Sequence, residues 1–268
     1  HLWHYEVTGS AIEEVLAAVM SECDSFAGVV LTSGSSGTLG CGDYLKEKFP
    51  ASKIAVGEAL QCPTLLLNGF GGHRIEGIGD KHVPWIHNVK NTDMVIAVDD
   101  ERAIRLMRLF NEPVGREALK SAKVPDGIVD NLDLLGISSI ANLIASIKFA
   151  KYYELTERDI VFTVFTDSME LYESRLREAH AHGEYTATDA AVDLDLLMNI
   201  TCENTLELDY YGRKRIHNLK YYTWIEQQAK RLEELNAQWH DREYWPRIHE
   251  LVPRIDELIE EFNWRVLG

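Results

Sequence analysis

A glycine- and serine-rich segment that directly follows a buried strand is the feature that most constrains this chain. Residues 26–32 (FAGVVLT) form a short apolar run with β-branched side chains, which is typical of a strand buried on both faces. Residues 33–38 (SGSSGT) come next, and residues 43–48 have the pattern of a helix. This order favours a phosphate site, because loop amides and the positive end of the helix dipole both point at the anion.

Taken alone, the loop favours phosphate binding and a plain turn about equally, since many strand-to-helix turns carry Gly and Ser. It is not a P-loop, because no Lys-Ser or Lys-Thr pair closes it. It also lacks the G-x-G-x-x-G pattern that binds dinucleotides. Other parts of the sequence must therefore identify the phosphate.

Charge and cysteine usage exclude several classes of protein. The 268 residues carry a net charge of −16, which argues against nucleic acid as a partner. The 4 cysteines are widely spaced without a C-x-x-C pair, as in free thiols of a reducing cytoplasm. Cys41 near the loop fits either thiol chemistry or a small buried residue. No signal peptide or membrane-spanning stretch is evident, so we expect a cytoplasmic protein without membrane partners.

The order of elements predicts an α/β fold. Strands are predicted at residues 26–32, 53–59, 93–98 and 159–165, and helices at 11–20, 43–48, 99–110 and 140–153. Such alternation favours a mostly parallel sheet flanked by helices. Glycines thin out after about residue 172 and helical patterns dominate. We therefore predict an α/β domain over residues 1–172 and a helical C-terminal extension over residues 173–268 that packs on it.

Residues 69–80 form a second glycine-rich stretch, which we interpret as a mobile functional loop. Within it, His73, Arg74 and Gly77 are candidates for substrate contact or loop closure, although ordinary surface polarity explains the charged pair equally well. Glu58 at a strand end is a further candidate, or else a helix cap. No metal site is predicted.

Six segments occur in the same order as in a known family. They resemble the pyridoxal-phosphate (PLP) enzymes of fold type II, the cysteine synthase and tryptophan synthase β-like family. The matching segments are residues 4–9 (HYEVTG), 34–38 (GSSGT), 43–50 (DYLKEKFP), 72–79 (GHRIEGIG) with the downstream Val-Pro at 83–84, 135–139 (LGISS) and 166–172 (TDSMELY).

The resemblance assigns roles to individual residues. The cofactor phosphate would be held by Gly34, Ser35, Ser36, Gly37 and Thr38, and the pyridine nitrogen by Ser168. A neutral hydroxyl at that nitrogen suits elimination and replacement at Cβ better than transamination. Strand alternation would put Thr166 and Ser168 on one face if the strand continues that far. The alternative for Ser168 is a helix N-cap.

Two departures from the family limit what the resemblance implies. The loop has serines where the family has Thr and Gly, which is tolerable because the serines still donate. The family's Pro-Thr-Gly-Ser-x-Lys motif, whose lysine forms the Schiff base, and its Ser-Gly-Asn loop have no counterpart here, so no catalytic residue is assigned. We therefore expect the C-terminal portion of a PLP-dependent lyase or transferase, inactive alone. The remaining segment would be disordered, cleaved or on a second chain.

The long C-terminal tail leaves several functions open. Residues 215–228 have no counterpart in plain cysteine synthases and resemble a longer subgroup that includes the β subunit of 2-amino-4-ketopentanoate thiolase. A non-catalytic PLP-binding partner subunit and a structural protein with a helical interaction module are further alternatives. The resemblance also implies a small amino-acid substrate and a homodimer.

Overall fold

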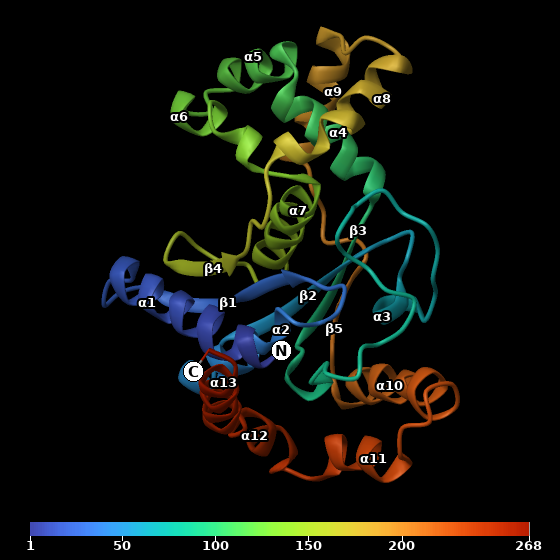
Figure 1. Ribbon diagram of the computed structural model, residues 1–268. Coiled ribbons are helices and arrows are strands. Elements are labelled where there is room, and N and C mark those ends of the chain that lie inside the picture. The colour runs from blue at the N-terminus through green and yellow to red at the C-terminus, as the bar shows by residue number, and fades with distance from the viewer. Residues whose placement is uncertain (268) are drawn as a thin grey trace.

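The computed structural model describes residues 1–267, and in that range five strands form one sheet in the order β4-β1-β2-β3-β5 (Figure 1). The strands are β1 (Ser25–Thr32), β2 (Lys53–Ala59), β3 (Met94–Val98), β4 (Asp159–Thr163) and β5 (Thr205–Glu207). β1 pairs in parallel with β2 and with β4, and β2 pairs in parallel with β3. Only β5 pairs antiparallel, against β3. The predicted mostly parallel sheet flanked by helices is confirmed.

The α-helices surround this sheet. They are α1 (Gly9–Val19), α2 (Leu39–Lys48), α3 (Thr64–Leu67), α4 (Asp100–Asn111), α5 (Pro113–Ser121), α6 (Asp126–Val129), α7 (Ile137–Tyr152), α8 (Glu173–Ala181), α9 (Ala187–Met198), α10 (Tyr210–Lys220), α11 (Leu232–His240), α12 (Tyr244–His249) and α13 (Val252–Leu267). Short π and 3₁₀ segments complete the chain at η1 (His4–Thr8), η2 (Val89–Asn91), η3 (Leu132–Leu134), η4 (Met169–Tyr172) and η5 (Tyr221–Ile225).

Alternate residues of each central strand face opposite layers of the core. Val30 of β1 joins one hydrophobic cluster, which packs against α4 and α7, whereas its neighbours Val29 and Leu31 join a second cluster. The second cluster includes residues of α1, α2 and α10. Successive side chains of a strand point to opposite faces of the sheet, and helices cover both faces here. Most residues of these strands are therefore buried, which explains their continuous apolar sequences.

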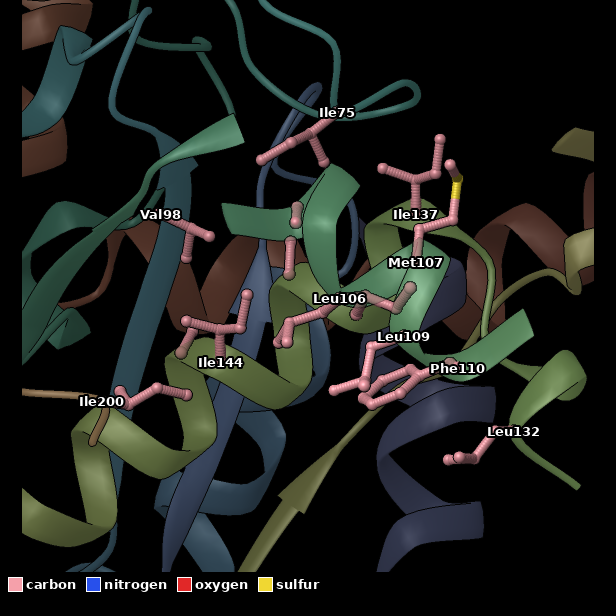
Figure 2. Packing of buried hydrophobic residues seen from close by; sticks show 14 of the residues in the cluster. Ile75, Val98, Leu106, Met107, Leu109, Phe110, Leu132, Ile137, Ile144 and Ile200 are labelled. Atoms are coloured by element: carbon pink, nitrogen blue, oxygen red, sulfur yellow. The ribbon is translucent and has the colours of Figure 1, made fainter. Parts of the chain in front are cut away.

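The larger of the two clusters lies between the sheet and the pair α4 and α7. Figure 2 shows Leu106 and Phe110 of α4 gathered with Ile144 of α7, and Val98 at the end of β3 lies nearby. All four side chains are buried. This packing fixes the start of α7 relative to the strand ends, which positions the site described below.

The second half of the chain, predicted as a helical extension, contributes one short strand besides its helices. Residues 205–207 add β5 to the edge of the sheet, and α9 packs against α4 and α5. The helices α10, α11 and α12 lie along the opposite side of the sheet (Figure 1). A three-residue strand leaves too little alternation for sequence patterns to detect. The boundary at residue 172 stays a prediction. Within residues 1–267, no helix combines the length and apolar character needed to cross a membrane.

Candidate functional site

The strand order places a switch point beside β1. The chain runs outward from β1 to β2 and β3, and β4 then returns to the other side of β1. In open parallel sheets, ligands bind at such a point, outside the carboxyl ends of the strands. A cavity of about 150 Å³ lies there. Its lining residues are His4, Leu31, Thr32, Gly34, Ser35, Ser36, Gly37, Thr38, Gly77, Ile78, Ser138, Asn142, Val164 and Thr166.

The loop at residues 33–38 forms one wall of this cavity and leads into α2, which begins at Leu39. Ser36 has a φ of +62°, a left-handed conformation that costs a non-glycine residue on the order of 1 kcal/mol. The Oγ atoms of Ser33 and Ser36 lie 2.9 Å apart, which holds this conformation. Among the described residues, the loop amides of Gly34, Ser35 and Thr38 donate to no other protein atom. The loop therefore presents free donors at a helix N-terminus, as an anion site requires.

Gly37 packs closely against a side chain from the start of the chain. A Cβ at this position would lie 3.3 Å from Cδ2 of His4, which lines the same cavity. The Nδ1 atom of His4 is 2.9 Å from the Thr8 hydroxyl, so the other ring nitrogen faces the loop. Burial lowers the pKa of His4, which keeps the ring neutral at pH 7. His4 lies in a segment that resembles the family, but no sequence pattern places its side chain at the cavity.

Asn142 of α7 holds the ends of β1 and β4 together. Its side-chain oxygen accepts a hydrogen bond from the Thr32 amide at 2.9 Å, and its amide nitrogen donates to the Val164 carbonyl at 2.8 Å. Strand pairing alone would leave both groups unsatisfied, because the two strands diverge at this point. Nothing in the sequence pattern of α7 singled out Asn142, since it lies within an apolar helix.

The wall opposite the loop carries two neutral hydroxyls. Ser138, near the start of α7, and Thr166, after β4, line the cavity with their side-chain oxygens 3.4 Å apart. Ser138 lies in a segment that resembles the family, and Thr166 lies two residues before Ser168, the predicted contact of the ring nitrogen. The cavity thus has uncharged donors at both ends.

The structure corrects the argument by which strand alternation brought Ser168 to the ring. β4 ends at Thr163, two residues before the predicted end, so alternation does not extend to residue 168. Thr166 lines the cavity and Ser168 is absent from its lining. Ser168 occupies the N-cap position of η4, as in its alternative interpretation, but its side chain makes no capping hydrogen bond. Its assignment to the pyridine nitrogen stays a prediction.

Glu58 is a buried cap beside the site. Its two carboxylate oxygens accept hydrogen bonds from the amides of Leu65 and Leu66, at 2.9 and 2.8 Å. Burial raises the pKa of Glu58 to about 7, against the lowering effect of these bonds. It also borders a second cavity, of about 10 Å³, together with Gly34 and Ser36. The contacts of Glu58 therefore support its interpretation as a helix cap.

The second glycine-rich stretch lies against the phosphate loop. The Gly79 amide donates to the Ser33 carbonyl at 2.8 Å, and Gly77, with a φ of +82°, lines the main cavity. Arg74 points elsewhere, because its guanidinium pairs with Asp100 and Glu101 at the start of α4, each at 2.6 Å. His73 packs close to Gly79. Of these three candidates from the sequence, Gly77 alone lines the cavity.

The cysteines take no part in the site. Cys41 is buried in α2, and burial raises the pKa of its thiol to about 12. A protonated thiol at neutral pH is a poor nucleophile. Of the two interpretations of Cys41, the structure favours the small buried residue.

Known proteins resemble this chain over a little more than half of its length. Cysteine synthase B of Campylobacter jejuni is 33% identical over 160 residues, which cover 59% of this chain and 46% of that protein. Cystathionine β-synthase of Saccharomyces cerevisiae is 29% identical over 178 residues, covering 63% and 31% of the two chains. The chain is thus similar in sequence to cysteine synthases over part of its length. A search of protein-family models finds none that matches.

A solved structure agrees with this relationship. The hydrogen sulfide-producing enzyme of Fusobacterium nucleatum superimposes with a TM-score of 0.52 at 26% identity, over 78% of this chain and 56% of that enzyme. The fold is therefore that of cysteine synthase-type PLP enzymes. The chain spans about half of the length of Cysteine synthase B, and what the whole of such a protein does is a separate question.

Proposed function

We propose that this chain binds pyridoxal phosphate by its phosphate group, as part of an enzyme that acts at Cβ of an amino acid by elimination and replacement. The observation that carries the proposal is the loop of free amides at residues 33–38, which lies at the β1–β4 switch point and at the N-terminus of α2. Its homology to cysteine synthases supports the choice of cofactor.

The residues at this end of the cavity fit a phosphate. Gly34, Ser35, Ser36, Gly37 and Thr38 would hold it through their amides and hydroxyls. Residue Asn142 would set the distance between this loop and the opposite wall, because it ties the two strand ends. His4 would donate from Nε2 if its Nδ1 accepts the Thr8 hydroxyl proton.

The other end of the cavity offers hydroxyls to the ring. Thr166 lines the cavity, and Ser168 follows two residues later, so both are candidates for the contact to the pyridine nitrogen. Pyridoxal phosphate supplies an electron sink for amino-acid chemistry. A hydroxyl partner keeps the ring a weaker sink than a carboxylate partner would, which favours elimination and replacement at Cβ.

No lysine of residues 1–267 lines the cavity. Within these residues, non-covalent contacts alone would hold the cofactor. A nucleophilic amine at the site would come from other parts of the protein or from a second chain. We accordingly expect the 268 residues by themselves to bind the cofactor without catalysing turnover.

A comparison of pyridoxal phosphate with pyridoxal tests the proposal. We expect the full chain to bind pyridoxal phosphate saturably and to bind pyridoxal at least ~100-fold more weakly, since the charge-assisted phosphate contacts are lost. Sodium borohydride should fix no cofactor covalently to residues 1–267. Equal binding of the two ligands, or no binding of either, would refute the phosphate site.

Activity assays test the reaction separately. The protein with its cofactor and its remaining segment or partner is expected to convert O-acetylserine and sulfide. Turnover of 2-amino-4-ketopentanoate with coenzyme A would instead support the thiolase β subunit, and tight binding without any turnover a non-catalytic partner subunit. The homodimer likewise stays a prediction, which the mass of the assembly in solution would settle.

A further inference from the structure

Three potential metal ligands from distant parts of the chain meet beneath the phosphate loop. The Nε2 atoms of His1 and His249 lie 3.2 Å apart. The Oδ2 atom of Asp43 is 3.6 Å from the first and 3.9 Å from the second. All three side chains are at least nine-tenths buried, with exposed fractions of 5%, 4% and 7% for His1, Asp43 and His249.

The surrounding residues hold the carboxylate in place. Asn91 donates to Oδ1 of Asp43 at 2.7 Å, and Asn88 lies 3.3 Å from both carboxylate oxygens. These amides leave Oδ2 as the oxygen that faces the two imidazoles. Among residues 1–267, no lysine or arginine pairs with Asp43, although its carboxylate is buried. A buried carboxylate of this kind needs a cation or a proton close to it.

The second ring nitrogen of His249 also lies near a carboxylate. Within residues 1–267 its Nδ1 atom has no hydrogen-bond partner, and it lies 3.7 Å from Oε1 of Glu47. The other oxygen of Glu47 accepts a hydrogen bond from Tyr5, whose ring stacks on His249 at 3.8 Å between centroids. Histidines that bind metals commonly turn their second nitrogen toward a carboxylate. A small rotation of Glu47 would complete that contact.

We propose that His1, Asp43 and His249 bind a divalent transition-metal ion with the coordination of Zn²⁺. For metal–ligand distances near 2.0–2.2 Å, the edges of a tetrahedron are roughly 3.3–3.6 Å long. The three observed separations, 3.2, 3.6 and 3.9 Å, bracket this range. Two imidazoles and one carboxylate suit Zn²⁺ and its neighbours, whereas Mg²⁺ and Ca²⁺ prefer oxygen ligands throughout. Water would take the fourth position.

The site would join distant parts of the chain. Asp43 is on α2, five residues after Thr38 of the phosphate loop, whereas His249 ends α12 in the C-terminal half. A bound ion would fix α12 to α2 and would thereby stabilise the helix whose N-terminus faces the cavity. Because the three ligand side chains are buried, a substrate could not reach the ion. The ion would therefore stabilise the fold rather than take part in chemistry.

Metal titration of the full, untagged chain tests this site. After dialysis against a chelator, Co²⁺ should bind at a ratio of one to one and develop the strong visible bands of tetrahedral cobalt. Zn²⁺ should displace it and raise the melting temperature. The near-ultraviolet band of a cobalt–thiolate bond should be absent, which would exclude the cysteines as ligands.

Variants locate the site. His249→Ala and His249→Gln should each weaken Co²⁺ binding at least 100-fold, and the glutamine variant retains a polar group that fills most of the space. His240→Ala is the matched control, because His240 is exposed at the end of the neighbouring helix α11. Circular dichroism establishes that each variant is folded.

Two results would overturn the proposal. One is a wild-type chain that binds neither Co²⁺ nor Zn²⁺ saturably, in which case the histidines share a hydrogen bond around Asp43. The other is equal binding by the wild type and His249→Gln. The wild-type cobalt spectrum decides the matter even if both variants fail to fold. None of these measurements depends on the cofactor, so their failure leaves the proposed function untouched.

Discussion

The phosphate loop directly precedes α2, and the His1–Asp43–His249 cluster includes Asp43 of that helix. The two sites are nevertheless built in opposite ways. The loop consists of six consecutive residues and offers backbone donors to an accessible cavity. The cluster consists of three side chains from separate elements and is sealed from solvent. The difference teaches that a backbone site can be recognised from contiguous sequence, whereas a side-chain site depends on what the fold brings together.

The largest effect on ligand binding should come from a charge placed in the phosphate loop. Gly34→Asp would put a carboxylate where the phosphate binds, in a position whose nearest neighbour is the Gly77 carbonyl at 3.5 Å. We expect pyridoxal phosphate to bind at least 100-fold more weakly, a loss of about 2.7 kcal/mol, as measured by fluorescence titration. Binding of Co²⁺ should be unchanged, which separates the two sites.

Gly72→Asp is the control for this variant, because nothing lies within 4 Å of a Cβ at Gly72. It should bind the cofactor as the wild type does. If Gly34→Asp left cofactor binding intact, or abolished Co²⁺ binding, the comparison between an independent loop and an independent cluster would fail.

A second variant tests how local the phosphate loop is. Asn142→Ala would leave the Thr32 amide and the Val164 carbonyl without their partner in a buried position. We expect the free energy of unfolding to fall by about 2–4 kcal/mol, measured by urea denaturation. Asn131→Ala removes an exposed hydrogen bond to Gly127 and should change it by less than about 0.5 kcal/mol. If the two variants lost the same free energy of unfolding, the phosphate loop would need no support from Asn142 of α7.

The buried carboxyl of Glu58 should make stability depend on pH. Burial raises the pKa of Glu58 from 4.5 to about 7, so its contribution is complete below pH 4.5 and is lost as the pH rises through 7. We expect the wild type to lose on the order of 2 kcal/mol relative to Glu58→Gln between pH 5 and pH 8. Urea denaturation across this range measures the difference.

The matched control for that titration is Glu117→Gln, since Glu117 is exposed on α5. Its stability should follow the wild type at every pH. If the free energies of unfolding of Glu58→Gln and the wild type differed by the same amount at every pH, Glu58 would not be the titrating group. Its hydrogen bonds to α3 would then contribute equally at every pH.

The smallest effect concerns the second glycine-rich stretch. Arg74→Ala removes the pairs with Asp100 and Glu101. Because the Arg74 side chain is 44% exposed, we expect the free energy of unfolding to fall by about 0.5–1 kcal/mol. Amide hydrogen exchange over residues 69–80 should become faster, while that of residues 33–38 changes less. Arg177→Ala, which breaks an exposed pair with Glu173, should alter neither. Unchanged exchange in the first stretch would show that Arg74 does not hold it.

Much of the sheet was predictable because its strands carry continuous apolar runs. The predicted strands at 26–32, 53–59 and 93–98 differ from β1, β2 and β3 by at most one residue at an end. β4 was placed correctly at its start and was two residues too long at its end. The chain turns away there although Val164 and Phe165 continue the apolar pattern, and the Asn142 bond to the Val164 carbonyl explains the turn.

The second half was less predictable. β5 is only three residues long and is placed by its pairing with β3. Even the paired residues nearest in sequence, Ile96 and Thr205, are 109 positions apart. The helix α2 begins four residues before the predicted segment, because two glycines in its first turn mask the helical pattern. Packing against the sheet overrides that low propensity.

The sequence by itself determined the strand–loop–helix unit, the α/β class and the relationship to PLP enzymes, because each depends on residues that are adjacent or in a fixed order. Only the tertiary structure decided which side chains share a space. It brought Thr166 rather than Ser168 to the cavity, turned Glu58 into a cap, and placed His1 and His249 beside Asp43. The physical reason is that backbone donors are set by local conformation, whereas convergent side chains are set by how distant elements pack.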